Sequence, residues 1–275
     1  MTSRRCRIGF LLAALVSLLA AAPPARYLDE IFTGANVVKD LVYGQSTLPD
    51  GKRQELLLDL YQPEGDAEMK RAAIVWIHGG GFFQGDKSDA PMSTLARRFA
   101  LRGYVTVSIN YRLERKNLTD ANLRGPVRDA MHDARAAVRW LRANAAKYRI
   151  DETRIAIGGG SAGAFTSLHV AYDSGEGDSG NPEFSSEVCA VVAFWGGLLD
   201  PAVMASGEPP LLVIHGTADN VVPFRMAERL VQRAKEVGVR CDFHPLEGKG
   251  HAAWKKMNEY IGWIAPFLYN NMIRR

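Results

Sequence analysis

The stretch Arg154–Phe165, RIAIGGGSAGAF, indicates the fold of this 275-residue chain. It opens as an apolar run typical of a buried strand and continues, from Ala162, as a run of small and apolar residues typical of a helix. Between them, Gly159, Ser161 and Gly163 form a G-x-S-x-G pattern. Three specified residues match by chance in roughly one chain in ten of this length, so the pattern alone is weak. Its place between a strand and a helix gives it weight, because a serine exposed on a tight strand-to-helix turn needs that context.

The two glycines of this turn have a physical reason. The chain reverses so sharply at Ser161 that the flanking positions leave no room for side chains, which explains Gly159 and Gly163. We expect Ser161 in a strained backbone conformation, with the first amides of the following helix aimed at its side chain. The alternative is a glycine-rich β–α turn that binds phosphate. No Lys-Ser/Thr pair and no downstream ribose-binding acid supports that alternative.

The rest of the chain alternates apolar runs with helical periodicity, which predicts a mostly parallel sheet with helices on both faces, an α/β fold. Strands are expected at residues 37–44, 55–63, 72–78, 104–112, 154–160, 190–197, 211–216 and 240–248. The first two are expected at the edge of the sheet, where they can pair as a hairpin. Helices are expected around residues 92–99, 127–141, 161–172, 224–234 and 254–268. No internal repeat and no linker is visible. We therefore expect one domain over residues 26–275.

The N-terminal residues have the pattern of a signal peptide. A basic segment with three arginines precedes the apolar run at residues 8–22, which is short for a membrane span. We expect a signal peptide over residues 1–25, with an uncertain cleavage site near Ala20 and Ala22, and a secreted or periplasmic protein. An uncleaved anchor is the alternative.

Charge and cysteine content exclude some function classes. The formal net charge is +4, and removal of the three N-terminal arginines would leave +1 (4 − 3), which gives no basis for nucleic-acid binding. The processed chain would keep Cys189 and Cys241 only, which is no disulfide framework. We expect one strand between these cysteines, and two strand spacings of about 9.5 Å are too wide for a disulfide.

A serine hydroxyl needs a base to become a nucleophile. His251 lies in the glycine-flanked loop between the last strand and the last helix, at the carboxyl edge where open α/β sheets bind ligands. The other histidines are expected to have packing or structural roles: His78, His132, His169, His215 and His244. We therefore predict His251 as the base.

The base needs a carboxylate to orient it. Asp219 follows the strand at residues 211–216 and lies on a loop at the same edge, whereas the rival Asp200 is nearer the preceding strand. Glu247, the other rival, is close enough to His251 to be a local loop acid. We favour Asp219, and the resulting order of serine, aspartate and histidine is the one expected of an α/β-hydrolase.

A triple glycine follows the strand at residues 72–78, in His78–Asp86, HGGGFFQGD. An attacked carbonyl develops negative charge on its oxygen, and bare backbone amides can approach and stabilise that oxygen. We predict that the amides of Gly80 and Gly81, with that of Ala162, form an oxyanion hole. A merely flexible turn is the alternative.

The segments HGGGF, NYRL, GGGSAGA, HGTAD and GKGH together resemble bacterial esterases of the hormone-sensitive-lipase type and the related feruloyl-esterase-like α/β-hydrolases. The resemblance covers nearly the whole processed chain. It implies the α/β-hydrolase fold, a small carboxylic-ester substrate, and no cofactor or metal. It also implies Ser161, Asp219 and His251 as catalytic residues, the same oxyanion amides, and supporting roles for Asp86 and Tyr111 beside His78. The chain has too little sequence for the large N-terminal cap of the first group, which favours the open, feruloyl-esterase-like group.

These observations predict a secreted serine carboxylesterase with a minimal cap. Phe82, Phe83 and Trp195 either wall a short apolar pocket or pack the core, and the small cap favours short acyl or aryl esters. An amidase such as a formamidase, or a small serine peptidase, would use the same three residues. A catalytically inactive binding module is the alternative outside enzymes. The natural substrate and the oligomeric state stay open.

Overall fold

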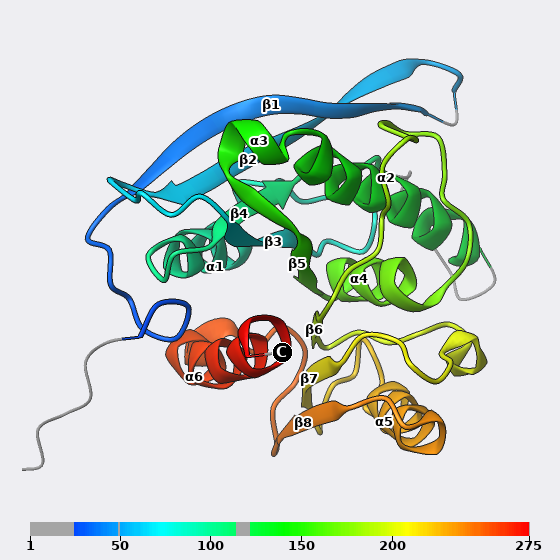
Figure 1. The fold of residues 1–275 in the computed structure, drawn as a ribbon. Coiled ribbons are helices and arrows are strands. Elements are labelled where there is room, and N and C mark those ends of the chain that lie inside the picture. Colours follow the sequence, from blue (N-terminus) through cyan, green and yellow to red (C-terminus); the bar gives the residue numbers. More distant parts are fainter. Residues whose placement is uncertain (1–24, 49, 114–121, 275) are drawn as a thin grey trace, which may run out of the picture.

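The structure is a computed structural model that describes residues 25–48, 50–113 and 122–274 (Figure 1). The predicted signal peptide, apart from Ala25, lies outside the described residues, so it stays a prediction. Within the described ranges, none of the helices combines the length and the apolar character that a membrane span requires.

The described chain forms an eight-stranded sheet in the order β1-β2-β4-β3-β5-β6-β7-β8. The strands β1 and β2 are an antiparallel hairpin, β2 pairs antiparallel with β4, and all the other pairs are parallel. The mostly parallel sheet is as predicted. The strands are β1 Ala35–Thr47, β2 Arg53–Pro63, β3 Arg71–Ile77, β4 Val105–Ile109, β5 Ile150–Gly160, β6 Val191–Phe194, β7 Leu211–Gly216 and β8 Cys241–Leu246.

Helices cover both faces of the sheet (Figure 1). The helices α1 and α6 pack on one face, and α2, α4 and α5 pack on the other. Short helical turns complete the set. The helices are α1 Ala90–Ala100, α2 Arg124–Ala143, α3 Ala145–Tyr148, α4 Ala162–Tyr172, α5 Arg225–Val237 and α6 Met257–Leu268, with turns η1 Pro201–Val203, η2 Trp254–Lys256 and η3 Tyr269–Ile273.

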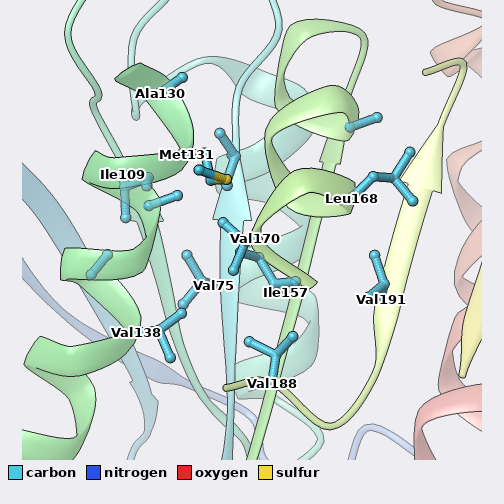
Figure 2. Close-up of a cluster of buried hydrophobic side chains, with 14 of the residues drawn as sticks. Val75, Ile109, Ala130, Met131, Val138, Ile157, Leu168, Val170, Val188 and Val191 are labelled. Atoms are coloured by element: carbon cyan, nitrogen blue, oxygen red, sulfur yellow. The ribbon is translucent and has the colours of Figure 1, made fainter. Parts of the chain in front are cut away.

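Figure 2 shows the packing on the α2 and α4 face. Val75 of β3 lies beside Val138 of α2, and Leu168 of α4 points toward Val191 of β6; all four side chains are fully buried. Because β3 and β5 are covered on both faces, their residues are apolar without alternation, as in a parallel sheet. This packing holds the ends of β3 and β5, which lead into the glycine loop and the turn at Ser161.

The start of the last helix differs from the sequence-based prediction, whereas the cysteines agree with it. The last helix was predicted to include Trp254, but α6 begins at Met257 and Trp254 lies in the separate turn η2. The cysteines are as predicted. Cys189 precedes β6 and Cys241 begins β8, and β7 lies between these two strands in the sheet. Within the described chain no disulfide joins them.

Candidate active site

Ser161 lies on a strained turn between β5 and α4. Its backbone has φ 55° and ψ −120°, a region that L-residues rarely adopt. A Cβ on Gly159 would lie 2.6 Å from the carbonyl oxygens of Gly163 and Ile77, and one on Gly163 would also overlap Ile77. Only glycine fits at both positions, as the sequence predicted, and the packing of β3 against the turn is the reason.

Three side chains from distant parts of the chain form a hydrogen-bonded relay. The Nε2 atom of His251 lies 2.9 Å from the Oγ of Ser161, and its Nδ1 lies 2.7 Å from the Oδ2 of Asp219. Because a carboxylate oxygen only accepts, Nδ1 carries the proton. Nε2 is then free to accept the proton of the serine hydroxyl. The structure thus brings together the three residues predicted as nucleophile, base and orienting acid.

The carboxylate of Asp219 is fixed by the loop after β7. Its Oδ1 accepts hydrogen bonds from the amides of Val221 and Val222, each at 2.9 Å, and its side chain is fully buried. The rival Asp200 instead caps the turn η1, where it accepts from the amide of Ala202 at 3.0 Å. Of these two acids, only Asp219 faces the histidine.

The loop that presents His251 is held by α6. The hydroxyl of Tyr260, on α6, donates to the carbonyl of Ala253 at 2.6 Å. Within the loop, the amide of Trp254 donates to the carbonyl of Ala252 at 2.7 Å. Ala252 has φ 56°, so the loop turns sharply directly after the histidine. These bonds hold the loop in a conformation in which the imidazole of His251 lies within hydrogen-bonding distance of Ser161.

The triple glycine loop lies against the serine turn. A Cβ on Gly79 would lie 2.9 Å from the carbonyl oxygen of Gly160 and 3.3 Å from the Cβ of Ser161. Gly80 and Gly81 have φ 107° and 62°, which favours glycine at both positions. Ala162 is the first residue of α4, so its amide has no partner within the helix. In the described chain no backbone acceptor is found for the amides of Gly80 and Gly81.

The residues predicted to have supporting roles, His78, Asp86 and Tyr111, form hydrogen bonds in and around the glycine loop. The Tyr111 hydroxyl donates to the His78 carbonyl at 3.1 Å, and the two rings stack at 4.5 Å. The Nδ1 of His78 donates to the carbonyl of Gly79 at 2.7 Å. Asp86 accepts from the side chain of Asn110 at 2.9 Å. Burial opposes its ionisation, but hydrogen bonds from Ser88 and Asn110 outweigh burial and lower the pKa of Asp86 to about 2.

We expect Tyr111→Phe to lower the free energy of unfolding by about 1 kcal/mol, because a buried carbonyl loses its donor. The kcat of any reaction that uses the glycine loop should fall several-fold. Tyr104→Phe is the matched control, since Tyr104 is equally buried and its hydroxyl has no partner among the described residues. Urea unfolding of both variants checks the difference. Equal losses would show that Tyr111 acts by packing alone.

A pocket of about 520 Å³ opens beside the serine. Its apolar wall includes the side chains of Phe83, Met92, Trp195, Val221 and Trp254. Of the two expected roles, Phe83 has that of a pocket wall, whereas Trp195 has both, because its buried ring packs in the core and borders the pocket. No group of three or more His, Cys, Asp or Glu side chains in the described ranges is placed to hold a metal ion.

Phe82 does not line this pocket, so for this residue the substrate-binding alternative is wrong and core packing is correct. It is buried in the core, with its ring 6.3 Å from that of Tyr111. Its φ of 65° turns its side chain inward while that of Phe83 faces the pocket. Trp254 was missed as a pocket residue, although it lies only three residues after His251. Its ring packs on Gly160, where a Cβ would lie 2.7 Å from the indole.

Comparison with known proteins places this geometry in a family. The BD-FAE family model matches residues 58–206, more than half of the chain, including the glycine loop and the serine turn. The chain belongs to the BD-FAE family. The model of the prolyl oligopeptidase family matches a further part of this BD-FAE member, residues 199–269, which holds Asp219 and His251.

Curated relatives of the BD-FAE chain are esterases and lipases. Esterase LipC of Mycobacterium tuberculosis is 24% identical over 240 residues, which cover 71% of this chain and 56% of LipC. Lipase 1 of Geotrichum candidum is 30% identical over 141 residues, covering 48% of this chain and 25% of the lipase. The chain therefore spans between a quarter and about three fifths of the length of such relatives.

Solved structures of similar length confirm the α/β-hydrolase fold. Thermogutta terrifontis esterase 2 phosphoramylated by tabun has a TM-score of 0.71 and 27% identity, and the match covers 87% of this chain and 95% of that chain. The same esterase with bound butyrate has a TM-score of 0.70 and 26% identity, with coverage of 86% and 94%. The fold predicted from the sequence is thus correct.

Proposed function

We propose that this BD-FAE chain is a serine carboxylesterase that hydrolyses small carboxylic esters through an acyl-enzyme intermediate. The observation that supports it most is the relay of Ser161, His251 and Asp219, joined by hydrogen bonds of 2.9 and 2.7 Å on a strained turn at a pocket. The esterase names of its relatives agree with this activity.

The first half of the reaction forms the acyl-enzyme. The Oγ of Ser161 attacks the ester carbonyl carbon as Nε2 of His251 takes its proton. The electron pair of the carbonyl moves to oxygen, where the amides of Gly80, Gly81 and Ala162 stabilise the negative charge. Collapse of this intermediate breaks the bond to the alcohol oxygen, which leaves with the proton from His251.

The second half releases the acid. A water molecule gives a proton to Nε2 of His251 and attacks the acyl carbon, with the same amides holding the oxyanion. The bond to Ser161 breaks, the serine oxygen regains the proton from His251, and the carboxylic acid leaves. Asp219 stays ionised and stabilises the imidazolium at both stages.

The pocket favours short acyl or aryl groups. Trp195 and Trp254 meet edge to face with their ring centroids 4.4 Å apart, which makes a rigid wall close to the serine. A long acyl chain gains about 0.8 kcal/mol for each buried methylene only where a tunnel or cap covers it. The related esterase 2 of Thermogutta terrifontis has been solved with butyrate and with propionate bound.

We expect kcat/KM on p-nitrophenyl esters to be highest at acetate or butyrate and to fall toward palmitate, without a jump above the critical micelle concentration. Hydrolysis of a feruloyl ester tests whether aryl esters are also substrates. Trp254→Ala should move the optimum to longer chains, because the ring that packs on Gly160 is gone. Trp263→Ala is the control, since that ring stacks on His244. A maximum at palmitate in the wild-type protein would contradict the proposal.

A second candidate function is amide or peptide hydrolysis, which the prolyl oligopeptidase match over residues 199–269 favours. The same three residues would cleave a formamide or a short peptide by the same steps. A matched panel of p-nitrophenyl esters and p-nitroanilides with identical acyl groups separates the two activities. The proposed esterase should prefer the ester throughout the panel.

An inactive binding module would show no covalent chemistry at the serine. Esterase 2 of Thermogutta terrifontis has been solved phosphorylated by paraoxon. We expect paraoxon to label this chain once, on the peptide that holds Ser161, and to abolish ester hydrolysis in proportion. Mass mapping that found no adduct there would contradict a nucleophilic Ser161.

A further inference from the structure

His215 lies at the end of β7, directly behind the orienting acid. Its side chain is fully buried, and the ring of Phe224 meets it edge on at 5.8 Å. From the sequence, only a packing or structural role is expected for it. The proposed mechanism makes no use of it, although it lies next to Asp219.

The hydrogen bonds of His215 define its tautomer. Nε2 lies 2.9 Å from the carbonyl oxygen of Val222 and 3.3 Å from the Oδ2 of Asp219. Both oxygens are acceptors, so Nε2 carries the proton. Its N–H donates to the Val222 carbonyl and also lies close to the carboxylate oxygen of Asp219. Nδ1 is buried and has no partner among the described residues. A proton on Nδ1 would therefore be buried without an acceptor.

Burial keeps this imidazole neutral. Loss of solvation lowers the pKa of His215, and the nearby His251 lowers it further. The hydrogen bond to Val222 and the negative charge of Asp219 act in the opposite direction but do not reverse the shift. A neutral histidine can place its N–H 3.3 Å from the Oδ2 of Asp219 without neutralising the negative charge of the carboxylate. The full charge of the carboxylate thus remains available to His251.

We propose that His215 is a positioning residue that holds the carboxylate of Asp219 in the plane that His251 requires. The Oδ1 of Asp219 takes two backbone amides, and its Oδ2 takes the N–H of His251. The N–H of His215, which donates to the Val222 carbonyl, lies 3.3 Å from Oδ2 and adds a fourth polar contact beside these three hydrogen bonds. Contacts on both oxygens restrict the carboxylate to one orientation. This inference rests on the proposed esterase function.

The test compares two replacements of similar size. His215→Phe keeps a buried ring but removes the N–H, whereas His215→Gln places an amide N–H near the former Nε2. We expect His215→Phe to lower kcat by about 10- to 100-fold with KM nearly unchanged, because the lost contact acts only on the base. His215→Gln should recover activity to within about fivefold of wild type.

The controls separate positioning from packing. His169→Phe replaces another buried histidine, whose Nδ1 donates to the Phe165 carbonyl within α4, and should leave kcat near wild type. Wild-type kcat in His215→Phe, or equal losses in the Phe and Gln variants, would overturn the proposal. If the Phe variant does not fold, Gln is compared with Asn, whose shorter side chain cannot reach Asp219, and equal activity of the two would overturn it.

The proposed function is tested separately by the wild-type protein. Ester hydrolysis and a paraoxon adduct on Ser161, together with a fully active His215→Phe variant, would reject the role of His215 alone. A wild-type protein with neither activity nor adduct would overturn both proposals.

Discussion

Replacing Ser161 with alanine is expected to lower kcat for ester hydrolysis by at least about 10⁴-fold, because the bond-forming oxygen is lost and the remaining groups cannot act without it. The free energy of unfolding should hardly change. Alanine keeps the Cβ, so the strain of φ 55° is neither relieved nor increased. The hydroxyl faces the pocket and His251 rather than the core.

Ser167→Ala is the matched control for this experiment. Ser167 follows Ser161 by six residues and lies within α4; it is fully buried and donates to the carbonyl of Gly163 at 2.7 Å. It should keep nearly full activity while losing about 1 kcal/mol of stability. Hydrolysis of p-nitrophenyl butyrate and thermal unfolding are measured for both variants. A Ser161→Ala protein with a tenth of wild-type turnover would mean that another group is the nucleophile.

The sequence predicts this site well where local rules act. The turn at Ser161 needs glycine on both sides for steric reasons, so its pattern is visible in a short window. His251 and Asp219 could be chosen because parallel strands end at one edge of the sheet, which brings their loops together.

Other features depend on backbone geometry that the sequence does not show. Phe82 and Phe83 are adjacent and chemically identical, yet Phe82, which has a positive φ, packs in the core while Phe83 lines the pocket. Trp254 fits the apolar spacing of the last helix, but it lies in the separate turn η2, where its ring packs on Gly160 beside the serine. The contact of His215 with Asp219 needs the turn at residues 219–222 to fold back on β7. Such choices are made by tertiary contacts.

Asp219→Asn is the second large effect that we expect, a fall in kcat of about 10⁴-fold. The environment of the carboxylate decides how an asparagine would sit. The amides of Val221 and Val222 both donate to Oδ1, so the asparagine oxygen must stay there. Its NH₂ group then takes the place of Oδ2 and faces Nδ1 of His251.

This orientation forces the wrong tautomer on the base. Nδ1 of His251 would have to accept from the amide, so the proton would move to Nε2, which then could not take the proton of Ser161. Asp200→Asn is the control, because Asp200 only caps η1, and it should keep nearly wild-type kcat. Both variants are compared by kcat for p-nitrophenyl butyrate and by thermal unfolding. If Asp200→Asn lost more activity than Asp219→Asn at equal stability, the acid would be misassigned and the carboxylate behind His251 would have a structural role only.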